Sequence, residues 1–272
     1  TVCYPNAGNI SGGGFLVYRT FDGEVGSLDF REKAPMASYP DMYLDELGNV
    51  IPKMSTLGGL SVGVPGTVAG LVEIHKRFGT LEWDELVQPA IDLARNGYIV
   101  TDNQEKSFKN KKEEFIALNG VETFYAQNFK SGDNIINLAL AETLERIAKF
   151  GKAGFYKGVN ADELVKRVKE TGGIITHEDL LAYDPVWREP INFQYKDLNI
   201  YTMGPPSSGG ICLGQIMKMI EPYEIGQYSQ NTIEAIQIIV EAERRSYADR
   251  SLYLGDPDFI NIPEDSLLNE NY

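Results

Sequence analysis

Apolar residues recur along this chain with two different periods, and the period changes with position. Short apolar runs, which are typical of β-strands, stand at 2–4, 15–18 and 25–30, and 189–203 has a strand pattern with turn residues around Lys196-Asp197. In the longer stretches between them, apolar residues return at helical spacing. These patterns predict strands near both ends of the chain and helices concentrated in its middle, without an internal repeat or a linker.

Residues that start or stop a helix mark the expected helix boundaries. A helix opened by Pro65-Gly66-Thr67 is expected to end at Gly79. Thr176 is followed three residues later by Asp179, which is the spacing of a capping box and predicts a further helix start. The remaining helices are expected over 80–97, 103–119, 136–150, 161–171, 211–220 and 232–247.

A glycine turn and a hairpin occupy the first part of the chain. Gly8–Gly14 (GNISGGG) holds four glycines in seven positions. This density suits positive φ angles or a backbone that comes very close to another segment. The strand Phe15–Tyr18 follows, and Asp22-Gly23 stands where a tight hairpin turn would fall. The strand Val25–Phe30 then returns, and Arg31 stands at its end.

The composition is that of a globular protein with an ample core. The chain has 272 residues, of which 43% are hydrophobic and 11% aromatic. This length allows one large domain or two small ones, and without a visible linker we expect a single domain over 1–272. The formal net charge of −14 argues against nucleic acid and against an anionic membrane surface as partners, because both carry negative charge. The apolar runs are also shorter than the roughly 18 residues that a membrane span needs.

Cysteines and histidines are too few for several kinds of site. Cys3 falls in a strand pattern and Cys212 in a helix pattern, so we expect both to be buried as small apolar side chains, with a disulfide left open. His75 lies on the apolar face of its helix, which favours a packed residue, and His177 lies in an exposed first turn. A Ser-His-Asp triad or a zinc site would therefore lack well-placed residues.

Signatures of cofactor and metal binding are also missing from the sequence. It contains neither the G-x-G-x-x-G pattern of dinucleotide sites nor a P-loop. Asp249, Asp256 and Asp258 lack the spacing of a calcium-binding loop and are expected to cap turns. We therefore expect no cofactor and no metal.

Several stretches together resemble the large subunit of the γ-glutamyltransferases (γ-glutamyltranspeptidases), members of the N-terminal nucleophile hydrolase superfamily. They are GNISGGGFLVYRT, LDFREKAP, VGVPGTVAGL, FGTLEWDELVQPAIDLARNGYIV, GFYKG, GGIITHEDLLAY, PPSSGG and YADRSLYLGDPDF. They cover nearly the whole chain in the order of the family. The resemblance implies an α+β fold, the four-layer αββα sandwich of this superfamily, which a large and a small subunit share.

Arg31 is the sharpest candidate for chemistry. A guanidinium grips a carboxylate through two parallel hydrogen bonds. The resemblance of LDFREKAP implies that Arg31 holds the α-carboxylate of a γ-glutamyl donor in this way. Alternatively, Arg31 pairs with Asp29 or Glu32 and only supports the fold. Asp29 and Glu32 are therefore candidates for neighbours that hold Arg31 in position.

Ser207 and Ser208 precede the helix expected over 211–220. Their hydroxyl groups suit capping of that helix, and the amides at a helix N-terminus also favour anions. A nucleophile elbow is excluded, since Pro205 stands where that motif needs a glycine. The resemblance of PPSSGG implies a role of both serines in the fold, near the catalytic centre.

The nucleophile is expected outside this chain. In the family it is a threonine that heads the small subunit after the precursor has cut itself, and Thr1-Val2-Cys3-Tyr4 does not resemble that segment. We therefore expect Thr1 to lie in an early strand and this chain to contain no catalytic residue. It would be a large subunit that is incomplete at both ends, paired with the small subunit of the same precursor.

The resemblance implies an acyl transfer. The threonine of the small subunit attacks the γ-glutamyl amide of glutathione or a similar donor, and water or an acceptor amine resolves the acyl-enzyme. A periplasmic or secreted location follows from the family's bacterial members. The alternatives are an acylase acting on β-lactam side chains or poly-γ-glutamate, and a catalytically inactive binding homologue.

Overall fold

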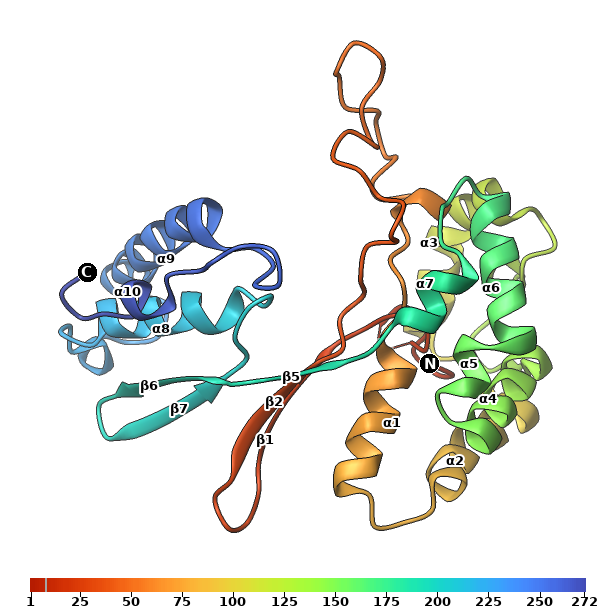
Figure 1. Cartoon of the computed structure of the whole chain (residues 1–272), viewed down its shortest axis with the longest axis horizontal. Coiled ribbons are helices and arrows are strands. Elements are labelled where there is room, and N and C mark those ends of the chain that lie inside the picture. Colours follow the sequence, from red (N-terminus) through yellow and green to blue (C-terminus); the bar gives the residue numbers. More distant parts are fainter. Residues whose placement is uncertain (8) are drawn as a thin grey trace. The chain divides into compact units, whose positions relative to one another are not determined.

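Helices and strands both contribute to the computed structural model, which describes residues 1–7 and 9–272 (Figure 1). The chain divides into two compact units. Unit 1 comprises Thr1–Gly14 and Phe30–Pro185, and unit 2 comprises Phe15–Asp29 and Val186–Tyr272. The presence of both helices and strands confirms the predicted α+β class. The expectation of a single domain over 1–272 stays a prediction.

Unit 1 is mainly helical. Its elements are η1 (Gly59–Ser61), α1 (Thr67–Phe78), α2 (Trp83–Asn96), β3 (Tyr98–Ile99), α3 (Asp102–Asn119), η2 (Phe124–Ala126), β4 (Asn134–Ile135), α4 (Leu138–Phe150), α5 (Ala153–Tyr156), α6 (Gly158–Glu170) and α7 (His177–Ala182). α2 packs against α4, and α4, α5 and α6 pack in sequence. Ile91, Leu144, Phe155 and Leu180 lie buried in the shared core, where each such side chain contributes about 1.5–3 kcal/mol.

Unit 2 combines short antiparallel strands with helices. Its elements are β1 (Phe15–Arg19), β2 (Val25–Asp29), β5 (Val186–Arg188), β6 (Ile191–Tyr195), β7 (Leu198–Thr202), α8 (Gly209–Ile220), η3 (Ile225–Gln227), α9 (Ile233–Tyr253) and α10 (Glu264–Leu267). β2 lies between β1 and β5, and its last residue, Asp29, is opposite Phe15 on one side and Val186 on the other. β6 and β7 form a separate hairpin whose Phe193 packs with Ile211 of α8.

Local signals account for most element boundaries. Gly23 adopts a φ of 97° in the predicted turn between β1 and β2, a conformation that glycine tolerates. α7 begins with the predicted capping box, in which the Thr176 hydroxyl accepts from the N–H of Asp179 at 3.2 Å. The Asp179 carboxylate accepts in turn from the N–H of Thr176 at 2.8 Å. Pro89 lies inside α2 and does not end this helix, although proline often does.

Predictions for the start of the chain are wrong in two respects. The described residues 1–7 contain no strand, so Thr1 does not lie in one. Cys3 is exposed rather than buried, although Val2 reaches the core of unit 1. Residues 2–4 are too few to distinguish the spacing of a strand from chance. Of these residues, only Val2 is buried. Cys212 is buried as predicted, and both cysteines are free thiols.

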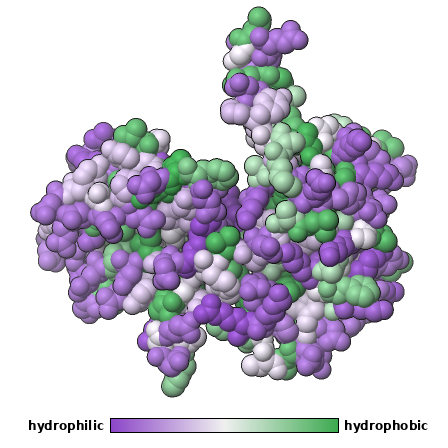
Figure 2. Space-filling view, in the orientation of Figure 1, coloured by the Kyte–Doolittle hydropathy of each residue, from purple (hydrophilic) through white to green (hydrophobic). Residues whose placement is uncertain are grey.

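Apolar side chains also reach the surface. Segment 34–57 projects from unit 1 (Figure 1), and Met36, Tyr39, Leu47 and Val50 on it are exposed. Figure 2 shows hydrophobic residues on this projection among hydrophilic ones. None of the helices in residues 1–7 and 9–272 combines the length and the apolar character that crossing a membrane requires.

Candidate functional site

The glycine turn lies directly against the segment that carries Arg31. The N–H of Gly14 donates to the carbonyl of Phe30 at 3.2 Å, and the N–H of Phe30 donates back to the carbonyl of Gly14 at 3.0 Å. A Cβ added at Gly13 would lie 2.7 Å from the Phe30 oxygen and 2.8 Å from the Cα of Arg31. The predicted close approach of the backbone is confirmed at Gly13, whereas Gly8 lies outside the described residues.

The N-terminus of α1 holds the other side of the turn. The N–H groups of Gly66 and Thr67 donate to the carbonyl of Gly12 at 2.8 and 3.0 Å. A Cβ added at Gly66 would overlap both the carbonyl oxygen of Phe30 and the hydroxyl of Tyr183. Glycine at this position therefore lets the start of α1 meet the main chain next to the candidate site.

Arg31 combines an exposed side chain with a fixed main chain. Its side chain is 54% exposed, and its Nε lies 3.7 Å from Oε2 of Glu32, whose side chain is 38% exposed. The carbonyl of Arg31 accepts a hydrogen bond from the hydroxyl of Tyr183 at 2.8 Å. An ion pair of this exposure contributes little to stability. The pair with Glu32 thus exists as one of the predicted alternatives, and the exposed Arg31 guanidinium is the type of group that binds carboxylates.

Asp29 precedes Arg31 by two residues and is held by another arginine. Nε of Arg188 donates to the Asp29 carboxylate at 2.9 Å, and the two terminal nitrogens donate to Asp258 at 2.9 and 2.8 Å. The side chains of Arg188 and Asp29 are 14% and 7% exposed. The hydrogen bonds to Asp258 raise the pKa of Arg188 above its usual value, burial opposes this rise, and Asp29 adds to it.

The predicted turn-capping role of the C-terminal aspartates needs correction. Asp256 does form a turn, since its carboxylate accepts from the N–H of Asp258 at 2.9 Å. Asp258 itself forms the ion pair with Arg188, and Asp249 bonds to side chains of other elements. Arg188 offers two parallel N–H donors to the two oxygens of Asp258, a bidentate pair that adds a second charge-assisted hydrogen bond.

Ser207 and Ser208 lie at the N-terminus of α8 in unit 2. The Ser207 hydroxyl accepts from the N–H of Gly209, the first residue of α8, at 3.2 Å. Ser208 occupies the N-cap position without a side-chain cap, and its hydroxyl accepts from Nε of Arg250 on α9 at 3.1 Å. Ser208 thus ties α8 to α9. A place of these serines near a catalytic centre stays a prediction.

Both histidines are engaged in local structure. Nε2 of His75 lies 2.8 Å from the carbonyl of Leu81, and its ring packs 5.4 Å from that of Trp83, which confirms a packed residue. His177 is exposed in the first turn of α7 as predicted, with Nε2 2.9 Å from Asp162. Within the described part of the chain, no three side chains of His, Cys, Asp or Glu gather in the way a metal ion would need.

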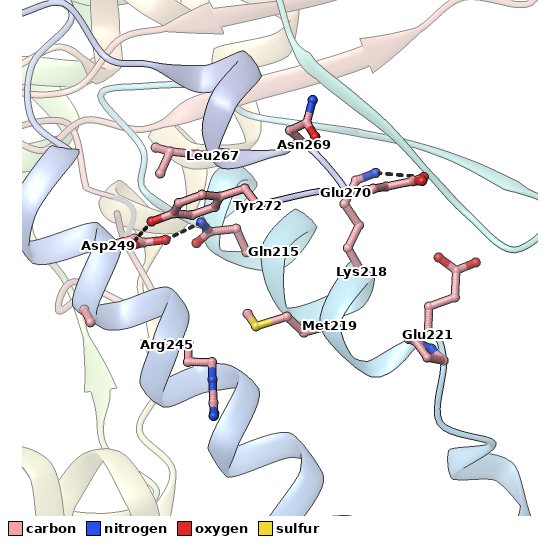
Figure 3. A pocket seen from close by; sticks show the side chains of 12 residues that line it. Gln215, Lys218, Met219, Glu221, Arg245, Asp249, Leu267, Asn269, Glu270 and Tyr272 are labelled. Carbon is pink, nitrogen blue, oxygen red and sulfur yellow. Dashed lines mark hydrogen bonds and ion pairs between the residues drawn. The ribbon is translucent and has the colours of Figure 1, made fainter.

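Unit 2 also contains a pocket of about 830 Å³ between α8, α9 and the last residues (Figure 3). The Asp249 carboxylate joins its walls, because it accepts from Nε2 of Gln215 at 2.7 Å and from the hydroxyl of Tyr272 at 2.9 Å. Oε1 of Gln215 is buried and has no hydrogen-bond partner among the described residues. The lining carries charges of both signs, so it does not select a ligand by charge alone. The charged residues are Lys218, Arg245, Glu221, Asp249 and Glu270.

The sequence did not single out Arg188 and Tyr183. Arg188 is 159 residues from Asp29, and Tyr183 is 152 residues from Arg31, so no local spacing connects these pairs. The available signals are weak. Arg188 is a charge at the end of a short apolar strand, and Tyr183 is the last residue of the stretch GGIITHEDLLAY.

Comparison with known proteins gives consistent matches over the whole chain. The family model described as Gamma-glutamyltranspeptidase matches residues 1–272. The chain is 42% identical over 275 residues to the glutathione hydrolase proenzyme of Escherichia coli (strain K12), and the match covers 100% of this chain and 47% of that protein. The chain spans about half the length of the curated relatives it matches.

Solved structures are similar as well. The crystal structure of Helicobacter pylori gamma-glutamyltranspeptidase matches with a TM-score of 0.96 and 42% identity, covering 100% of this chain and 79% of that chain. A gamma-glutamyltranspeptidase from Pseudomonas nitroreducens, complexed with L-DON, matches with a TM-score of 0.92 and 41% identity, covering 100% and 81%. These likenesses confirm the predicted fold class.

Proposed function

Because this chain belongs to the gamma-glutamyltranspeptidase family, we propose that it is part of an enzyme that cleaves the γ-glutamyl amide of glutathione and related donors. The γ-glutamyl group passes to water or to the amine of an amino acid or peptide. The relatives are named glutathione hydrolase proenzyme, which supports both the donor and the formation of the enzyme from a precursor. A periplasmic or secreted location is part of the proposal, on the resemblance to bacterial members.

The bond-making residue in this proposal is a threonine at the head of a second chain from the same precursor. Its hydroxyl oxygen attacks the γ-carbonyl carbon of the donor, the C–N bond breaks, and the amine leaves with the proton that the hydroxyl gave up. Water or an acceptor amine then attacks the ester and restores the hydroxyl. This chain contributes a contact to the donor rather than the nucleophile.

Features of unit 2 support a second chain. Among the described residues, its larger sheet has three strands in the order β1-β2-β5, so β1 and β5 each have one edge without a neighbour within that sheet. Leu198 and Tyr201 on β7 are exposed, as is Ile233 on α9. Open strand edges and exposed apolar side chains favour a partner that covers them. The greater length of the curated relatives agrees with such a partner.

The observation that carries the donor assignment is the geometry at Arg31. Its carbonyl accepts a hydrogen bond from Tyr183 and Gly13 comes close to its Cα, while its side chain is 54% exposed. A guanidinium on a fixed backbone can bind the α-carboxylate of the donor through two hydrogen bonds. Binding at this end of the donor orients the scissile amide at the other end.

The test compares two chromogenic donors that differ only in the group that Arg31 would bind. γ-Glutamyl-p-nitroanilide carries the α-carboxylate, and 4-aminobutanoyl-p-nitroanilide lacks it. In the two-chain enzyme, we expect Arg31→Ala to lower kcat/KM for the first donor about 100-fold, because charge-assisted hydrogen bonds contribute up to about 3 kcal/mol. The second donor should be cleaved as before, so the preference between donors collapses.

Arg167→Ala is the matched control. Arg167 is also half-exposed, and it pairs with Glu170 at 3.1 Å in a helix of the same unit, so its loss should leave both donors unaffected. A full preference for the γ-glutamyl donor in Arg31→Ala would show that Arg31 does not bind the carboxylate. If the protein without substitutions cleaves neither donor, it is a binding homologue. If it cleaves both donors equally well, it is an acylase.

A further inference from the structure

A buried tyrosine holds the main chain of Arg31 from a distant part of the sequence. Tyr183 directly follows α7 and is only 2% exposed. Its hydroxyl donates to the carbonyl of Arg31 at 2.8 Å, across 152 residues of chain. The hydroxyl of a buried tyrosine needs a partner, and here that partner is the peptide that carries the candidate ligand-binding residue.

Neighbouring groups fix the ring of Tyr183. It stacks on the ring of Tyr156, with centroids 5.8 Å apart and planes inclined by 11°. Nζ of Lys33 lies 5.3 Å from the centroid of the Tyr183 ring and donates to the carbonyl of Asp184 at 3.0 Å. Lys152 donates to the carbonyl of Tyr183 itself. With its ring and its main chain both held, the tyrosine presents its hydroxyl from one position.

The approach of this hydroxyl depends on Gly66. A Cβ at that position would overlap the hydroxyl of Tyr183 and the carbonyl oxygen of Phe30. On the other side, Gly13 comes so close that an added Cβ would lie 2.8 Å from the Cα of Arg31. The main chain of Arg31 is thus hydrogen-bonded at its carbonyl by Tyr183 and closely approached at its Cα by Gly13, from segments far apart in sequence.

We propose that Tyr183 is a positioning residue for Arg31 and, through it, for the carboxylate of the donor. This inference rests on the proposed function. The hydrogen bond fixes the peptide plane at Arg31, and this plane sets the direction in which the long side chain leaves the backbone. Small displacements of a positioning group weaken binding and alignment of a substrate strongly. Tyr183 acts through the main chain of Arg31, so it needs no contact with the donor.

Tyr183→Phe removes the hydroxyl and keeps the stacked ring. In the two-chain enzyme, we expect it to raise KM for γ-glutamyl-p-nitroanilide about 3- to 10-fold, which corresponds to the loss of one hydrogen bond, with kcat nearly unchanged. KM for 4-aminobutanoyl-p-nitroanilide should stay the same. The preference between the two donors therefore falls by the same factor, which a loss of stability alone would not produce.

Tyr156→Phe is the matched control. Tyr156 is also 2% exposed, stacks on the same ring, and donates to a main-chain carbonyl, that of Pro65, at 2.7 Å. The substitution removes an equivalent buried hydroxyl from the same core, but not one that bonds to Arg31. We expect a similar loss of thermal stability and an unaltered donor preference.

A rescue and a substitute complete the design. Tyr183→4-aminophenylalanine keeps a donating N–H group at the ring position and should restore the donor preference. Tyr183→Phe is replaced by Tyr183→4-fluorophenylalanine if the Phe variant does not assemble. The fluorine fills the place of the hydroxyl but donates no hydrogen bond. The fluoro variant is then compared with the 4-aminophenylalanine variant.

The outcomes separate this inference from the function on which it rests. If Arg31→Ala abolishes the donor preference and Tyr183→Phe leaves it intact, the positioning role is overturned and the proposed function stands. An equal fall of the preference in Tyr156→Phe would also overturn it, because the effect would then belong to the core as a whole. If Arg31→Ala retains the preference, the donor contact and the positioning role both fail.

Discussion

Two arginines associated with the end of β2 have opposite surroundings. Arg188 is 14% exposed and donates to Asp29, the last residue of β2, and to Asp258. Arg31, two residues after Asp29, is 54% exposed, and its Nε lies 3.7 Å from Glu32. The Arg188 guanidinium is largely buried and bonded to two carboxylates, whereas the Arg31 guanidinium is about half-exposed beside Glu32.

The difference shows how a protein can separate the structural and the binding roles of the same side chain. Removing a charge from water is expensive, so a buried arginine is stable only when carboxylates satisfy its donors. An exposed arginine can exchange one partner for another at small cost. The exposure of Arg31 therefore suits an exchangeable carboxylate ligand, whereas the burial of Arg188 suits a structural role.

The largest effect is expected when the buried pair is broken. Arg188→Met should lower the free energy of unfolding of the two-chain enzyme by about 3–5 kcal/mol, because it leaves the buried carboxylate of Asp29 without its cation. Chemical denaturation followed by circular dichroism measures this change. The matched substitution Arg31→Met should alter the free energy of unfolding by at most about 1 kcal/mol. Equal losses in the two variants would contradict the division into a structural and a binding arginine.

A smaller effect is expected from crowding the main chain of Arg31. Gly13→Ala should lower the free energy of unfolding by about 1–3 kcal/mol, since the added methyl meets the backbone atoms of Phe30 and Arg31, which must move. KM for the γ-glutamyl donor should rise as well. Both quantities are measured by denaturation and by the p-nitroanilide assay.

Gly12→Ala is the control for this substitution. A Cβ at Gly12 would meet its nearest neighbour, the carbonyl oxygen of Asn9, at 3.4 Å, which is ordinary van der Waals contact. We expect a change within about 0.5 kcal/mol and an unaltered KM. If Gly12→Ala and Gly13→Ala behave alike, the close approach does not hold Arg31 in place.

Sequence patterns predicted the local parts of this structure well. The hairpin turn at Gly23, the helix ends at Gly79 and Gly97 and the capping box at Thr176 all follow from conformations that a few neighbouring residues determine. The glycine density before β1 also predicted the close approach found at Gly13. The strand expected at residues 2–4 is the exception, because its apolar pattern reflects the burial of Val2 alone.

The contacts around Arg31 were less accessible to prediction. The importance of Arg31 came from resemblance to a family, since a charged residue at a strand end has many structural roles. Its support by Tyr183 and the pairing of Asp29 with Arg188 join residues more than a hundred positions apart. Such pairs depend on how the chain folds back on itself, and spacing along the sequence carries no information about that.

The smallest effect is expected at Glu32, where the two carboxylates that can bind Arg31 compete. Glu32→Gln removes one negative charge from an exposed pair, so the free energy of unfolding should change by less than about 1 kcal/mol. KM for γ-glutamyl-p-nitroanilide should fall about twofold, which corresponds to roughly 0.4 kcal/mol, and the difference should shrink as salt screens the charges. Glu170→Gln, beside the similarly exposed Arg167, should leave KM unaffected. A rise of KM in Glu32→Gln would mean that Glu32 assists donor binding, either by aligning Arg31 or by pairing with the α-ammonium group of the donor.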